Sequence, residues 1–85
     1  MQTYPDFEHK FNLLLRRHLD LLAKTEIKPL GTDLKVKEEV QNLLKELRNF
    51  IIESRGKIND RIRSKVATYE EVWLRKAKKH GISLE

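Results

Sequence analysis

Apolar residues recur every three or four positions along three stretches of the chain, which is the spacing of an amphipathic helix. The first stretch runs from Tyr4 to Leu21, the second from Val36 to Leu47 and the third from Ile58 to Ala77. Each pattern stays in phase from beginning to end, so one face of each helix is apolar. The chain is therefore expected to form three helices that bury these faces against one another.

Residues that start or stop helices place the ends of these stretches. Pro5 suits a first helical turn, with Thr3 or Asp6 as its cap, and Pro29 disfavours helical angles at the residue before it. Thr32 and Asp33 mark the second start; the remaining stop and start signals are Gly56, Asn59 and Gly81. We predict an all-α antiparallel three-helix bundle with helices at approximately 4–24, 34–55 and 58–80 in a single domain, 1–85.

Two alternatives to this arrangement remain open in the sequence. If Gly56 does not break the chain, the second and third helices merge into one long helix, against which the first folds. The third helix could also break near Ala67, because Thr68 followed by Glu71 has the spacing of a capping box. The apolar stripe crosses Ala67 in phase, which favours a continuous helix.

Composition narrows the class of protein. There is no cysteine, which is usual for an intracellular protein, and no apolar run long enough to span a bilayer. The first six residues lack the features of a signal peptide. We expect a monomeric module of a larger intracellular protein, cytoplasmic or nuclear, with no membrane partner.

Catalytic and metal-binding patterns are not found in the sequence. Neither His9 nor His80 has a second ligand at metal-binding spacing, and no serine lies in a glycine-flanked elbow. We expect no enzymatic activity, no metal and no cofactor. His18 lies on the apolar stripe, so it is either a half-buried histidine with one hydrogen-bond partner or a pH-sensitive group.

Some apolar residues also have two interpretations. Tyr69 and Trp73 are one turn apart on the third stripe, which favours a role in the core over stacking against nucleic-acid bases. Leu13 and Leu19 fall outside the first stripe. They are either ordinary exposed leucines or part of a surface that binds a partner.

Charge is distributed unevenly along the chain. Residues 1–54 carry nine Lys or Arg and nine Asp or Glu, whereas residues 55–80 carry nine Lys or Arg and three Asp or Glu. At about 100° per residue, five of these cations fall in one sector of about 80° beside the core stripe of the third helix. We name them the basic ridge: Lys57, Arg61, Lys65, Arg75 and Lys79.

The stretch from Ala77 to Ser83 resembles the first helix and turn of a helix-turn-helix motif, with a small residue, a glycine four positions later, an aliphatic residue and a serine. The resemblance covers about 15 residues, from Tyr69 onward. It departs from the pattern at Lys76, where an aliphatic residue is usual. An ordinary glycine cap after the helix explains the same residues.

These patterns favour a non-catalytic module that binds another protein. The partner would offer an amphipathic helix to an apolar groove between helices, or an acidic segment to the basic ridge. The alternative is a domain that contacts DNA or RNA phosphates through the basic ridge. A further alternative is an oligomerisation element.

Overall fold

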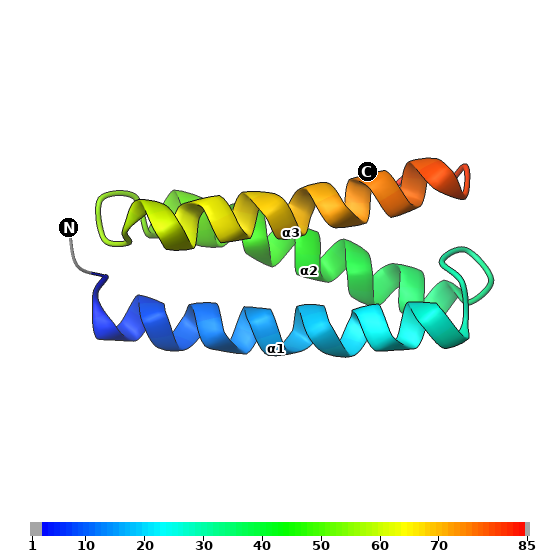
Figure 1. Ribbon diagram of the computed structural model, residues 1–85, viewed down its shortest axis with the longest axis horizontal. Coiled ribbons are helices and arrows are strands. Elements are labelled where there is room, and N and C mark those ends of the chain that lie inside the picture. Colours follow the sequence, from blue (N-terminus) through cyan, green and yellow to red (C-terminus); the bar gives the residue numbers. More distant parts are fainter. Residues whose placement is uncertain (1–2, 85) are drawn as a thin grey trace.

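The computed structural model describes residues 3–84 and contains three helices, α1 (Pro5–Ile27), α2 (Leu34–Glu53) and α3 (Asp60–Lys79). They run up, down and up in an elongated bundle with extents of 41 × 19 × 16 Å (Figure 1). α2 packs closely against both of its neighbours, whereas the backbones of α1 and α3 lie farther apart. The predicted all-α antiparallel three-helix bundle is confirmed.

The ends of α1 differ from the sequence-based expectation. The helix continues to Ile27 rather than ending near Lys24, because Pro29 forces only Lys28 out of helical angles (φ −121°, ψ 102°). At the other end Tyr4 is the N-cap, without a side-chain hydrogen bond. Thr3 instead accepts a hydrogen bond on Oγ1 from the backbone N–H of Asn59 (3.0 Å). Its side chain therefore ties the start of the chain to the start of α3.

The connection between α2 and α3 shows that these helices are separate. Gly56 adopts a left-handed conformation (φ +76°), which a glycine reaches without a Cβ clash. Asn59 then caps α3, accepting a hydrogen bond on Oδ1 from the backbone N–H of Ile62 (2.9 Å). Asp33 caps α2 in the same way through the N–H of Lys35 (2.9 Å).

α3 is continuous through the position where a break was possible. The hydroxyl of Thr68 donates to the carbonyl of Ser64 within the helix (2.9 Å), so it does not start a new one. The helix ends in a Schellman motif, in which Ile82 N–H donates to Ala77 C=O (2.8 Å) and Gly81 is left-handed (φ +68°). An ordinary cap therefore explains the residues that resemble a helix-turn-helix.

The residues after this cap return to the bundle. Leu84 is buried, and its carbonyl accepts a hydrogen bond from Gln41 Nε2 (3.5 Å). Ile82 covers Gly31, where an added Cβ would lie 2.3 Å from Ile82 Cδ1. Residues 82–84 thus close one end of the core and form no helix.

α2 supplies the centre of the core. Val40, Leu43 and Leu47 have no exposed surface, and neither does Trp73 of α3. Burying a large apolar side chain of this kind stabilises a fold by about 1.5–3 kcal/mol. Within residues 3–84, no helix combines the length and apolar character needed to cross a membrane.

Candidate interaction surface

The seams between helices are closed by different interactions. Ion pairs cross from α2 to both neighbours: Lys10–Glu53, Arg17–Glu46, Lys24–Glu39 and Arg48–Glu70. Among the described residues, no ion pair joins α1 to α3. These two helices meet through aromatic rings, since Tyr69 stacks on His18 (4.3 Å between centroids) and on Phe11 (6.1 Å). Among the described residues, the α1–α3 seam is thus joined by ring contacts rather than by ion pairs.

The basic ridge falls into two groups along the bundle. Lys57 lies in the connection before α3, and the other four residues lie on α3. Arg61 and Lys65 are one turn apart, as are Arg75 and Lys79, and about 15 Å of helix separates Lys65 from Arg75. The ridge is thus interrupted in the middle rather than continuous.

Two members of the basic ridge already have partners within the chain. Arg75 pairs with Glu71 one turn before it, and Lys57 Nζ lies 5.4 Å from the ring centroid of Phe7, a cation–π distance. No acid among residues 3–84 pairs with Arg61, Lys65 or Lys79. These three cations remain available to an anionic partner.

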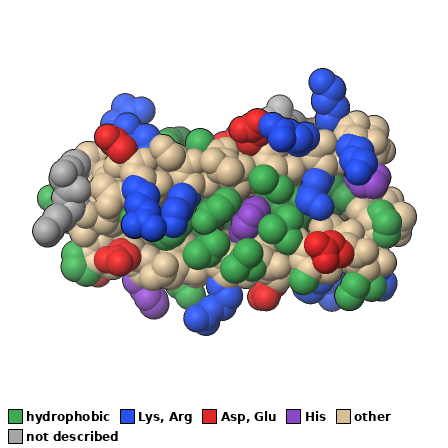
Figure 2. Space-filling model, in the orientation of Figure 1, with side chains coloured by type: hydrophobic (Ala, Val, Ile, Leu, Met, Phe, Trp, Pro, Cys, Tyr) green, Lys and Arg blue, Asp and Glu red, His purple; other side chains and the backbone are tan. Residues whose placement is uncertain are grey.

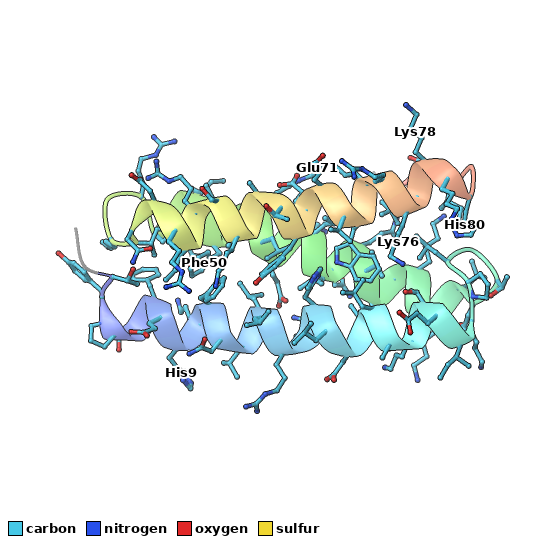
Figure 3. The ribbon with its side chains drawn as sticks, in the orientation of Figure 1. His9, Phe50, Glu71, Lys76, Lys78 and His80 are labelled. Atoms are coloured by element: carbon cyan, nitrogen blue, oxygen red, sulfur yellow. The ribbon has the colours of Figure 1, made fainter. Side chains whose placement is uncertain are left out.

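Lys76 is a further cation that the sequence-based ridge omitted. It is half-buried, and Figure 3 shows it on the side of α3 that faces α1, whereas Lys78 points to the opposite side. Like Lys65, it has no acidic partner among the described residues. A signal existed in the sequence, because Lys76 lies where the helix-turn-helix pattern usually has an aliphatic residue.

Apolar side chains continue outward from the aromatic contacts onto both helices. On α1, Arg17 faces α2. The helical repeat places three leucines on the other side of Phe11, within about 80° of it: Leu22, Leu15 and Leu19, in that order around the helix. Around α3, away from the α2-facing Glu70, it brings Val72 within about 60° of Tyr69. We call this row the α1–α3 strip: Leu15, Leu19, Leu22, Tyr69 and Val72.

The α1–α3 strip is incompletely covered. Leu19 is 55% exposed and the other four residues are half-buried. Figure 2 shows hydrophobic side chains along the seam between α3 and α1, with Lys or Arg side chains at either end of that stretch. An apolar surface edged by unpaired cations can bind a partner that is apolar on one side and acidic beside it.

His18 lies at the inner edge of the α1–α3 strip. Its ring is 4% exposed, and its Nδ1 accepts a hydrogen bond from Trp73 Nε1 (2.9 Å). The neutral ring therefore carries its proton on Nε2. Burial lowers the pKa of His18 below its ordinary value of 6.5. The expected single hydrogen-bond partner is thus present, in a more fully buried site than expected.

The two aromatic residues of α3 have different environments. Trp73 has no exposed surface, which confirms its predicted place in the core, and its indole meets the His18 ring edge-on at 5.7 Å. Tyr69 is half-buried, and its ring stacks on the buried ring of His18. Burial raises the pKa of Tyr69 above 10.0. Tyr69 therefore links the core to the α1–α3 strip.

A groove of about 540 Å³ lies on the other side of α1, against α2. Leu13, which is 48% exposed, contributes to it together with Leu14 and Phe50. The charged residues that line it are three bases and three acids: Lys10, Arg16, Arg17, Asp20, Glu46 and Glu53. Two ion pairs among them cross the seam, so this groove offers no net charge to a partner.

The chain was compared with protein families, curated proteins and solved structures. No family model, curated protein or solved structure matches this chain. Within residues 3–84, no group of three or more His, Asp or Glu side chains could hold a metal ion. The surface must therefore be interpreted from its own chemistry.

Proposed function

We propose that this protein is a non-catalytic interaction module that binds a helical segment of another protein on the α1–α3 strip. Apolar side chains that lie in a row along two helices are the usual receptor for one face of an amphipathic helix. A bound helix would lie beside α1 and α3 and complete a four-helix arrangement. The cysteine-free composition supports a setting inside the cell.

One observation carries the proposal: the α1–α3 seam keeps apolar surface partly exposed and has unpaired cations beside it. The seams that α2 makes are crossed by ion pairs, so cations there already have acidic partners within the chain. An apolar row of this kind loses water when a partner covers it, at a gain of about 25 cal/mol per Å² of apolar area.

The test is a selection of helical peptides from an unbiased displayed library, with the intact chain as bait. Recovered peptides are then measured against two variants, Leu19→Lys on the α1–α3 strip and Leu13→Lys on the α1–α2 groove. Both leucines are about half exposed on α1, so each substitution leaves the fold intact. Binding that survives Leu13→Lys and is lost in Leu19→Lys supports the proposal. Recovery of no peptide, or loss only in Leu13→Lys, rejects it.

The unpaired cations of α3 favour a second candidate, a domain that binds nucleic-acid phosphates through Arg61, Lys65 and Lys79. Anisotropy titrations with duplex DNA, single-stranded DNA and RNA at about 50 and 200 mM salt test this function. Phosphate binding predicts that log affinity falls by about 0.9 per contact per log unit of salt. A variant with Arg61, Lys65 and Lys79 changed to glutamine should then bind more weakly. No binding at the lower salt eliminates this candidate.

A further inference from the structure

We infer that the partner segment is an acidic amphipathic helix whose acids lie about three turns apart and face Lys65 and Lys76. This inference rests on the proposed function and specifies the chemistry of its partner. It uses a feature that the apolar surface alone does not define, which is the position of the cations relative to the apolar residues of α3.

The flank of α3 that faces α1 has a symmetrical pattern. Lys65, Tyr69, Val72 and Lys76 fall within a sector of about 60°, at intervals of four, three and four residues. The two lysines are about 16 Å apart along the helix axis, with the apolar pair between them. A helix lying along this flank would place an acid against each lysine if its acids were 11 residues apart, with apolar residues four and seven positions after the first.

The opposite edge of the α1–α3 strip sets the orientation of those acids. α1 contributes Leu15, Leu19 and Leu22 there, and its acids on that side, Glu8 and Glu26, lie near its two ends. An acid on the partner would be repelled by α1 carboxylates and attracted by the lysines of α3. The acidic flank of the partner therefore faces α3, and its apolar flank faces α1.

A second copy of this chain fits the α1–α3 strip less well than such a partner. The acids that a second copy could offer from the equivalent surface, Glu8 and Glu26, are about 27 Å apart on α1. The lysines that they would have to match are separated by about 16 Å. The spacings differ by about two turns, so both pairs cannot form together.

The experiment uses three synthetic helical peptides that have equal helicity and differ only in the two charged positions under test. The first peptide carries two Glu residues 11 positions apart, at the edge of its apolar face. The second has Lys at those two positions. The third has the two Glu residues on the face opposite the apolar one. Each is titrated by fluorescence anisotropy against wild type, Lys65→Glu/Lys76→Glu, and the matched control Arg63→Glu/Lys78→Glu. The two double variants change net charge equally, and circular dichroism verifies that both remain folded.

The inference predicts that wild type binds the first peptide at least about tenfold more tightly than the other two peptides. Lys65→Glu/Lys76→Glu should lose that advantage and prefer the second peptide, whereas the control should stay within about threefold of wild type. Equal affinity for the first and third peptides would overturn the inference, as would equal losses in both double variants.

The same titration separates this inference from the proposed function. If helical peptides bind in a manner that depends on Leu19 but is indifferent to the two lysines, the module remains and the acidic partner is wrong. If wild type binds no helical peptide, the proposed function fails as well. Light scattering measures the oligomeric state and so tests whether a second copy occupies the strip. A dimer that becomes monomeric in Leu19→Lys would show that a second copy fills the α1–α3 strip.

Discussion

Lowering the pH is expected to destabilise the protein through His18. The neutral ring accepts a hydrogen bond from the indole of Trp73 and is buried beneath Tyr69. Protonation puts a second donor opposite the indole N–H and a charge in a poorly hydrated site. Since the pKa of His18 is lowered in the fold, the unfolded chain takes up this proton first. Stability is thus complete above about pH 6.5 and is lost as pH falls toward the folded-state pKa.

The size of this effect follows from proton linkage. One extra proton bound by the unfolded state changes the free energy of unfolding by about 1.4 kcal/mol per pH unit at most. Between pH 7.5 and 5.5, a histidine that titrates at about 6.5 only when unfolded therefore removes up to about 1.4 kcal/mol. That is a substantial part of the margin of a small domain.

Urea unfolding followed by circular dichroism at the two pH values measures this loss. His18→Gln retains an acceptor for the indole N–H but does not titrate, so its stability should be nearly equal at both pH values. The control variant His9→Gln/His80→Gln changes the two exposed histidines and should retain the wild-type pH dependence. Equal stability of wild type at both pH values, or an unchanged pH dependence in His18→Gln, would refute the reasoning.

Four further substitutions test the fold by urea unfolding. Asn59→Ala removes the cap of α3 and should cost about 1 kcal/mol, whereas no measurable loss would show that the hydrogen bond to Ile62 is unimportant. Gly31→Ala should lower the free energy of unfolding by about 1–3 kcal/mol. The loss should exceed that of Gly56→Ala, because only at Gly31 (φ +101°) does the new Cβ also meet another side chain. Leu47→Ala should cost about 2–5 kcal/mol, and a loss below 1 kcal/mol would contradict its place in the core.

The apolar periodicity and the residues that start or stop helices predicted the helices, because both depend on residues close together in the sequence. The apolar stripes, Gly56 and Asn59 specify where a helix can bury a face and where it must stop. The end of α1 was placed too early because Pro29 excludes only Lys28 from the helix. Thr25 is buried in the last turn, and its hydroxyl donates to the carbonyl of Leu22 within the helix (3.0 Å).

The candidate surface was only partly accessible to sequence reasoning. The helical repeat placed the basic ridge on one flank of α3, and it marked Leu19 as lying off the stripe of α1. It could not show that α1 and α3 approach each other less closely than either approaches α2, because that depends on how three helices share one core. For the same reason it could not identify Trp73 as the partner of His18.

The most direct test of the central claim is to map the binding site on the protein itself. Amide and methyl resonances of the isotopically labelled chain would be recorded while a peptide from the unbiased selection is added. The account predicts that the shifts concentrate on the α1–α3 strip, led by Leu15, Leu19 and Val72, with little change at Leu13 or Asn49. Shifts concentrated on the α1–α2 groove, with the strip unaffected, would contradict it.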